Sequence, residues 1–279
     1  MKKSTWFCDL RLRLVFLVLL AVIPALVVIF RGAEQQRSAL ALEAQQNALR
    51  TARLVSANQE VLIAGTRQLL TALANAPVVQ NGDPGCSAFF HELLEKYPYY
   101  SNLAVANSDG WQTCSALSLP TGPVNIADRA YFRRTIERGD FALGDYQIGR
   151  ITAKATINAG YPLHDRAGKL IGIVYAGIDL AWLHGVVAKT RLPAGSAVTL
   201  VDRNGTIFVR YPDAENTVGQ VMPAGALRDA ILAQNGEGAL DAKGIDGVER
   251  LYGFLPLLDG AATVIVGLPK QTVSATADR

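Results

Sequence analysis

Residues 128–179 gather side chains whose chemistry suits the recognition of a small charged molecule. Arg129 has a planar guanidinium group whose paired N–H donors match a carboxylate. Asp179, at the other end of the stretch, has a carboxylate that can receive an ammonium group. The aromatic side chains suited to wall such a site and to contact a cation are Tyr131, Phe132 and Tyr146. Because a few convergent polar groups among apolar walls are typical of ligand pockets, the stretch predicts a small-molecule site.

Three further residues are weaker candidates for the same pocket, namely Lys154, Asn158 and Tyr175. They lie on segments of strand character that can line one hollow. Lys154 and Arg150 also fit a solvated surface, because long cationic side chains are seldom fully buried. Tyr131 and Phe132, taken singly, are more typical of a core than of a ligand wall.

The two acids at the ends of this stretch also have a structural interpretation. Asp128 fits the N-cap of a helix that carries the nearby arginines, and Asp179 fits the N-cap of a helix that begins at Leu180. The two roles of Asp179 are compatible, since a capping carboxylate leaves one oxygen free for a ligand.

The elements that must position these side chains are one short helix and three strands. The amphipathic helix carries Arg129 and Tyr131, and its other arginines are expected on a solvated face, namely Arg133, Arg134 and Arg138. The segments of strand character that follow are residues 141–151, 156–163 and 170–179. A helix over residues 180–189 follows the last strand.

A second unit repeats this theme further along the chain. Its expected strands are residues 197–201, 206–210, 249–256 and 263–268, with a helix near 225–234. The turn glycines Gly110 and Gly205 are 95 residues apart, and Pro162 and Pro256 are 94 apart. Two markers at nearly the same offset predict a duplicated module. Antiparallel hairpins with helices on one face place both modules in the α+β class.

The N-terminal residues predict a membrane anchor. The cations of the basic flank, residues 1–13, are Lys2, Lys3, Arg11 and Arg13. The uncharged run over residues 14–30 has about the minimum length for a helix that crosses a hydrocarbon core of roughly 30 Å. A cleaved signal peptide is the alternative, but the run is longer than a signal core and no A-x-A site follows before the helical pattern resumes. The flank is expected in the cytoplasm and the rest outside.

Residues 31–76 predict one long amphipathic helix, because they include no proline before Pro77 and, after residue 32, only one glycine, Gly65. The apolar residues that fall on multiples of seven are Leu42, Leu49, Ile63 and Leu70. One face is expected to pack on its own domain, and a weak homodimer seam is the alternative use of this pattern.

The three cysteines fit an exported domain. Cys8 lies on the cytoplasmic side or at the membrane, whereas Cys86 and Cys114 lie in the exported part, where a disulfide persists. Two separately buried thiols are the alternative. Export and the even number of exported cysteines favour a disulfide.

Composition and motifs argue against several classes of function. The net charge of +3 is too small to indicate a nucleic-acid partner. The histidines, which are His91, His164 and His184, form no metal-ligand spacing. Neither a G-x-S-x-G, a Walker loop nor a G-x-G-x-x-G is present. We therefore expect no enzymatic activity, no cofactor and no metal in this chain.

The order of basic flank, membrane helix, long exported helix and two PAS-like modules resembles the double Cache (dCache) sensor domains of bacterial transmembrane receptors. The segments that carry the resemblance are residues 128–132, 144–146 and 172–180. The resemblance implies that residues 77–190 form a membrane-distal module that binds the ligand. It implies a membrane-proximal module over residues 191–270 that passes the change on, and a connector to a second span that starts at 271–279.

Some dCache receptors for amino acids share a ligand motif, which this chain matches in part. Arg129 occupies its arginine position, Tyr146 lies near its later tyrosine and Asp179 occupies its aspartate. Tyr131 and Phe132 stand where the motif has Trp and Tyr. The leading tyrosine is absent, because Val124 stands there. The match supports the location of the pocket more than the identity of its ligand.

The resemblance implies the sensing region of a receptor in a bacterial inner membrane, with one N-terminal span and most of the chain in the periplasm. Its ligand would be an amino acid, an amine or a small carboxylate. Its output domain, a histidine kinase or a diguanylate cyclase, would lie beyond these residues. A membrane-anchored solute-binding protein is the main alternative, and a periplasmic interaction module is the next.

Overall fold

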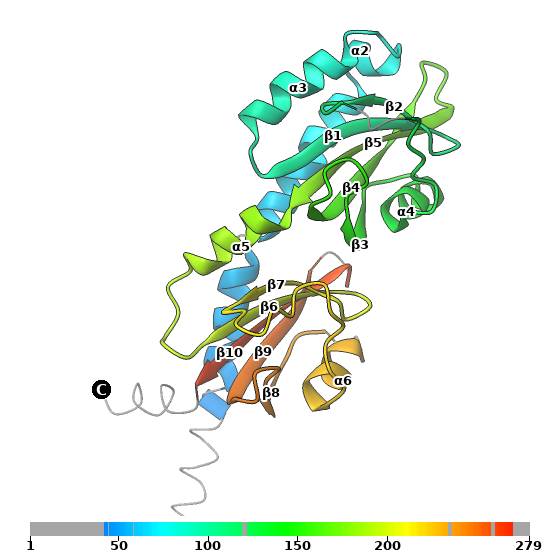
Figure 1. Cartoon of the computed structure of the whole chain (residues 1–279). Coiled ribbons are helices and arrows are strands. Elements are labelled where there is room, and N and C mark those ends of the chain that lie inside the picture. Colours follow the sequence, from blue (N-terminus) through cyan, green and yellow to red (C-terminus); the bar gives the residue numbers. More distant parts are fainter. Residues whose placement is uncertain are drawn as a thin grey trace, which may run out of the picture.

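The computed structural model describes residues 42–269, apart from 44, 58, 119–121, 234–235 and 258–259. Two five-stranded antiparallel sheets follow one another along a long N-terminal helix (Figure 1). The fold is therefore of the α+β class, with two modules as the sequence predicted. The predicted span at 14–30 and the connector at 271–279 lie outside the described residues. Within those residues, none of the helices combines the length and the apolar character needed to cross a bilayer.

The first sheet and its helices form what we call the N-terminal module. Its strands are β1 (Tyr100–Asn107), β2 (Gln112–Ser115), β3 (Ala142–Ile148), β4 (Ala155–His164) and β5 (Leu170–Asp179). They lie in the order β2-β1-β5-β4-β3. Its helices are α2 (Pro77–Gln80), α3 (Cys86–Lys96) and α4 (Ala130–Arg138), and α5 (Leu180–Ala188) leads out of it.

The second sheet, with one helix, forms the C-terminal module. Its strands are β6 (Ala197–Asp202), β7 (Ile207–Tyr211), β8 (Gly238–Lys243), β9 (Glu249–Leu257) and β10 (Ala262–Pro269), and its helix is α6 (Ala226–Leu232). The order β7-β6-β10-β9-β8 repeats that of the first sheet, strand for strand. Strand β8 was not predicted, because its sequence of Gly, Ala, Leu, Asp, Ala and Lys is poor in strand formers.

The long helix is helical over residues 42–43, 45–57 and 59–74, and it packs against both modules (Figure 1). Its buried residues recur every three or four positions, as expected for one face of a helix. In the N-terminal module, the hydroxyl of Tyr100 donates to the hydroxyl of Thr66 over 2.9 Å. In the C-terminal module, a Cβ on Gly253 would lie 2.5 Å from the Ala48 backbone. The helix thus supports both sheets directly.

The heptad pattern predicted along this helix is only partly a surface feature. Ile63 and Leu70 are buried in the core that the helix shares with the two sheets, so they cannot face a partner chain. Leu42 is 57% exposed. A homodimer seam through Ile63 and Leu70 is therefore wrong, because the modules of the same chain already cover that face.

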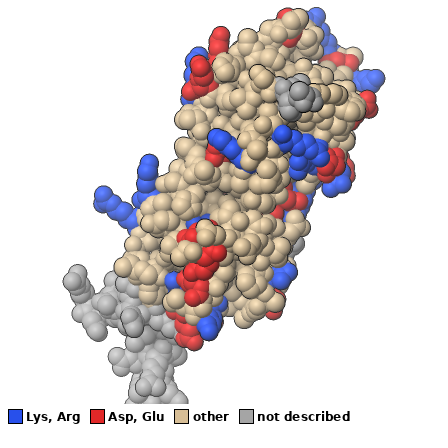
Figure 2. Space-filling model, viewed as in Figure 1, with Lys and Arg blue, Asp and Glu red and all other residues tan. Residues whose placement is uncertain are grey.

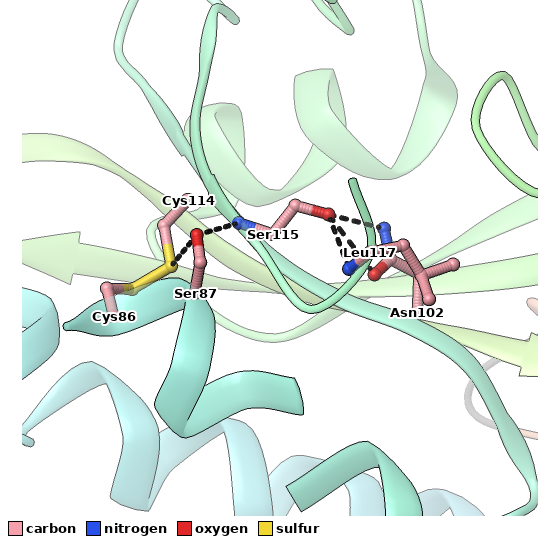
Figure 3. The surroundings of a disulfide bond; sticks show 6 residues. All are labelled: Cys86, Ser87, Asn102, Cys114, Ser115 and Leu117. Carbon is pink, nitrogen blue, oxygen red and sulfur yellow. Dashed lines mark hydrogen bonds between the residues drawn. A yellow bond between two sulfur atoms is a disulfide. The ribbon is translucent and has the colours of Figure 1, made fainter. Parts of the chain in front are cut away.

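A disulfide joins Cys86, at the start of α3, to Cys114 on β2 (Figure 3). The two Cα atoms are 6.0 Å apart, and the cysteines are 28 positions apart in the sequence. The hydroxyl of Ser87 accepts from the Ser115 amide over 3.4 Å, and the Ser115 hydroxyl lies 3.2 Å from Asn102 Nδ2 (Figure 3). The disulfide thus anchors a network that reaches Asn102 on β1.

Candidate functional site

A pocket opens on the face of the first sheet that α4 covers, with a volume of about 390 Å³ including the part open to solvent. Four of the eight predicted ligand residues line it, namely Arg129, Tyr131, Asn158 and Tyr175. Polar residues that sequence reasoning did not select line it as well, namely Ser101, Asn102, Gln112, Gln147, Arg150, Thr152 and Thr156. The pocket is therefore more polar than the sequence suggested.

The floor of the pocket depends on a glycine in β5. Gly177 pairs with Asn158 of β4, and a Cβ on Gly177 would lie 2.6 Å from the hydroxyl oxygen of Ser101. Any larger residue would therefore push Ser101 aside and fill the hollow. Because side chains alternate along a strand, Tyr175, Gly177 and Asp179 all point to the pocket face.

Two tyrosines form the apolar wall. Their ring centroids, in Tyr131 and Tyr175, lie 5.2 Å apart. Burial raises the pKa of Tyr131 to about 12 and that of Tyr175 well above its ordinary value, so both phenols stay neutral. The hydroxyl of Tyr175 donates to Gln112 Oε1 over 3.1 Å. Both side chains are therefore fixed parts of the core as well as of the pocket wall.

Arg129 lies at the N-cap position of α4 without capping it through its side chain. Its Nη2 lies 3.4 Å from the Ile148 carbonyl oxygen, and none of the residues that the structure describes forms an ion pair with it. Asp128, predicted as the N-cap, is instead held by Arg150, with contacts of 2.9 and 2.7 Å. The hydrogen bond from Arg150 lowers the pKa of Asp128. The capping prediction for Asp128 is thus wrong.

Asp179 does not line the pocket. Its Oδ1 accepts from the backbone amides of Ala181 and Trp182, so it caps α5 as predicted. Its Oδ2 lies 3.1 Å from Nζ of Lys154. The oxygen expected to be free for a ligand is therefore occupied by Lys154, which is itself outside the pocket lining.

Phe132 and Tyr146 do not line the pocket either. Phe132 is buried in the small core between α4 and the sheet. Tyr146 lies where the two modules meet: its amide donates to Oδ2 of Asp202 over 3.1 Å. A Cβ on Gly219, whose φ is +88°, would lie 2.7 Å from the Tyr146 hydroxyl. The aromatic ring is thus part of a module junction, which local sequence cannot indicate.

Charged residues reinforce this junction. Arg134, predicted on a solvated face, forms a two-point ion pair with Asp145 at 2.8 and 2.9 Å. Arg203 of the C-terminal module lies 3.9 Å from the same Asp145 carboxylate. Burial lowers the pKa of Arg203, and the nearby Arg134 lowers it further. Strand β3 and helix α4, which carry pocket residues, are therefore tied to the turn between β6 and β7.

The equivalent position in the C-terminal module is occupied by a buried charged cluster. Gly267 pairs with Tyr252 there, as Gly177 pairs with Asn158 in the N-terminal module. Arg250 binds Asp246 through two contacts of 2.8 Å, and Nη2 of Arg210 lies 3.4 Å from the same carboxylate. The side chains of the chain itself fill this position, so the N-terminal module offers the better candidate site.

Charges on the visible face of the molecule are scattered in small groups of both signs (Figure 2). They form no continuous basic patch on that face, in keeping with the low net charge. Among the described residues, no group of three or more His, Cys, Asp or Glu is arranged to hold a metal ion.

Two antiparallel sheets of identical strand order on one helix, with a polar pocket in the first, define a tandem sensor module. The chain belongs to the Cache domain family, whose double Cache model matches residues 33–277. The match confirms the family resemblance noted in the sequence and makes this a domain of signal transduction.

Solved structures share the fold. The ligand-binding domain of the Pseudomonas fluorescens chemoreceptor CtaA, in complex with L-isoleucine, has a TM-score of 0.64 and 16% identity, covering 86% of this chain and 98% of that one. The domain of the Pseudomonas aeruginosa PAO1 amino-acid chemoreceptor PctB, in complex with L-Gln, has a TM-score of 0.59 and 18% identity, covering 82% and 92%. At these identities the similarity shows the fold alone.

A curated relative extends the similarity to kinases. Sporulation kinase D of Bacillus subtilis (strain 168) is 24% identical over 212 residues, which are 76% of this chain and 41% of the kinase. The chain thus spans less than half the length of this relative.

Proposed function

We propose that this chain is the extracytoplasmic ligand-sensing region of a membrane receptor. Its N-terminal module binds a small molecule, which is an amino acid, an amine or a small carboxylate. The observation that carries this proposal is the pocket in which Arg129, unpaired with any described acid, faces two neutral tyrosines. Chemoreceptor domains of the same fold, solved with L-isoleucine and L-Gln, support an amino-acid-sized ligand.

The same proposal gives the C-terminal module a role in transmission to a cytoplasmic output domain such as a histidine kinase or a diguanylate cyclase. Ligand contacts at α4 and β3 would shift the elements that hold Asp202 and Arg203 of the C-terminal module. Such a shift requires that the ligand bind two states unequally. We place the N-terminal span in a bacterial inner membrane and both modules in the periplasm, and we assign no catalytic role to this chain.

Arg129→Ala should weaken ligand binding about 10- to 100-fold, because a charge-assisted hydrogen bond contributes roughly 1.5–3 kcal/mol. The measurement is a thermal-shift screen of the full chain against amino acids, amines and small carboxylates. A ligand at about 100 times its Kd should stabilise the chain by about 2.7 kcal/mol.

The matched control is Arg133→Ala, which removes an exposed arginine from the same helix. Ligand binding that survives Arg129→Ala unchanged would place the site elsewhere. A chain that responds to no compound of the three classes would contradict the proposed function itself.

We also propose that the receptor is a homodimer through the outer face of the long helix. Leu54 and Val61, each 73% exposed, lie one heptad apart on that face, and the exposed Ala57 and Ala64 lie between and beyond them. Exposed apolar residues that repeat every seven positions, with small alanines near them, allow a second identical helix to pack closely.

Leu54→Cys and Val61→Cys, each in a Cys8→Ser background, should form crosslinked dimers of the full chain in membranes. Glu60→Cys is the control, since it is also exposed but lies about 100° around the helix from Val61. The rate of crosslinking is measured by non-reducing electrophoresis. A rate at positions 54 and 61 that is no higher than the rate at position 60 would argue against this dimer.

A further inference from the structure

We propose that the N-terminal pocket takes a small carboxylate without an ammonium group, and that the Lys154–Asp179 ion pair is what excludes amino acids. This inference rests on the proposed ligand-binding function of the same pocket and narrows its ligand class. It follows from the charges of the pocket lining and from the hydrogen-bond donors in the pocket that have no partner.

The charges that line the pocket are of one sign. Its lining includes two arginines, Arg129 and Arg150, and neither Asp, Glu nor Lys among the residues that the structure describes. The carboxylate of Asp128 is already bound to Arg150, so it leaves Arg129 as the cation without an acidic partner. A negatively charged ligand is therefore favoured, and a positively charged group is repelled.

A second donor without a partner points the same way. Gln112 is 8% exposed, and its Nε2 has no hydrogen-bond partner although it is buried. Its other amide atom, Oε1, already accepts from the Tyr175 hydroxyl. A buried donor left without a partner costs free energy, so a ligand with oxygen acceptors would be bound more favourably here.

Two side-chain amide oxygens of the pocket lining already accept a hydrogen bond. Oδ1 of Asn158 accepts from the Thr156 hydroxyl over 2.7 Å. Oδ1 of Asn102 accepts from the Ser115 hydroxyl over 3.3 Å. The acceptors of the lining are neutral, so they offer a ligand ammonium no opposite charge, whereas Arg129 offers one to a carboxylate.

Asp179 borders the pocket without lining it, because it pairs across the strands with Thr156, which does line it. Its carboxylate could accept a ligand ammonium there, but both of its oxygens already have partners. Oδ1 receives the amides of Ala181 and Trp182, and Oδ2 receives Nζ of Lys154 at 3.1 Å. Lys154 thus holds the oxygen that a ligand ammonium reaching the border of the pocket would use. Its side chain is 62% exposed, so its removal should free this oxygen without disturbing the core.

The test compares ligand pairs that differ only by one amino group: propionate with L-alanine, succinate with L-aspartate, and butyrate with 4-aminobutyrate. Binding to the full chain is measured by thermal shift and by calorimetry. We expect at least one carboxylate to bind about tenfold or more tightly than its amino partner, since one charge-assisted contact is worth about that factor.

Lys154→Met should reduce this preference about tenfold, because Oδ2 of Asp179 becomes free to accept an ammonium group. Lys169→Met, which changes an exposed lysine in the turn between β4 and β5, should leave the preference unchanged. The ratio of the two affinities is the readout. Because the ligands of a pair differ in net charge, Lys169→Met is needed to show how much a general loss of positive charge changes this ratio.

Tighter binding of the amino partners by the unmodified chain would overturn the inference and leave the proposed function standing. An unchanged preference in a folded Lys154→Met variant would also overturn the role of the ion pair. If that variant does not fold, the ligand pairs on the unmodified chain still decide the ligand class. A chain that binds none of the six compounds, nor any compound of the wider screen, would contradict both the inference and the proposed function.

Discussion

Asp202→Asn is expected to break the hydrogen bond that joins β3 of the N-terminal module to the turn at residue 202, while the turn itself stays intact. In the native chain, Oδ1 of Asp202 accepts the amides of Asn204 and Thr206, each over 2.9 Å. Oδ2 accepts the amide of Tyr146 in the other module. The substitution keeps one oxygen for the turn and puts an NH₂ donor opposite the Tyr146 N–H.

The duplicated module shows that asparagine suits this turn. Asn107 holds the equivalent place in the N-terminal module, where its Oδ1 accepts the amides of Asp109 and Trp111 over 3.1 and 2.8 Å. An asparagine thus suffices for the turn. The second carboxylate oxygen of Asp202 therefore serves the contact with Tyr146.

The expected loss is one hydrogen bond to a charged acceptor, roughly 1.5–3 kcal/mol. Hydrogen exchange should show faster exchange of the Tyr146 amide, by about 10- to 100-fold, with unchanged protection of Thr206. Asp202→Ala, which removes both sets of contacts, should lose the protection of Thr206 as well. Native protection of the Tyr146 amide in Asp202→Asn would mean that this contact does not couple the modules.

Asp246→Ala is expected to be the most destabilising of the substitutions proposed for this chain, by about 3–5 kcal/mol. The Asp246 carboxylate is 12% exposed and is bound by Arg250 and faced by Arg210. Without the Asp246 carboxylate, the buried guanidinium groups of Arg210 and Arg250 lose the negative charge that compensates them. Nε and Nη2 of Arg210 already lack hydrogen-bond partners, and the other acid near this side chain, Glu215, is 43% exposed and lies 3.9 Å from Nε, so it compensates only weakly.

The pH dependence of this cluster has a definite sign. Burial by itself would raise the pKa of Asp246, but the hydrogen bonds from Arg250 and from the Val248 amide outweigh it and hold that pKa below the ordinary 3.8. A pKa that is lower in the folded than in the unfolded state stabilises the fold above the unfolded value. The contribution is therefore present above about pH 4 and is lost as the pH falls below it.

Chemical denaturation at neutral and acid pH measures both effects. Asp246→Ala should be much less stable than the native chain at pH 7, and this difference should shrink as the pH falls towards about 3. Asp83→Ala, at an exposed position before α3, is the control and should change stability by less than about 0.5 kcal/mol. A difference that does not change with pH would show that the charge of Asp246 is not what stabilises the cluster.

Local patterns in the sequence determined the elements and their order. The strand predicted at residues 170–179 is β5 to the residue, because its run of apolar strand formers is bounded by a turn and by a capping aspartate. The repeat of turn glycines predicted two modules, and the strand orders of the two sheets match. Propensity and periodicity act over a few residues, so they can be recognised without the fold.

The composition of the pocket was decided by the tertiary structure. Gln112 and Ser101 precede the stretch that sequence reasoning selected, and they reach the pocket only because β1 pairs with β5 and β2 pairs with β1. Their signal in the sequence is weak, since a single polar residue in an apolar strand looks the same whether it faces a ligand or another side chain.

Partners distant in sequence also decided what each predicted residue does. The second carboxylate oxygen of Asp179 binds Lys154, which lies 25 residues earlier in the sequence. The amide of Tyr146 binds Asp202, which lies 56 residues later, and this contact places Tyr146 at the junction of the modules. Hydrogen bonds and ion pairs form between whatever groups the folded chain brings within about 3 Å. The sequence by itself therefore determined where a pocket would form, while tertiary contacts decided which groups remain free to bind a ligand in it.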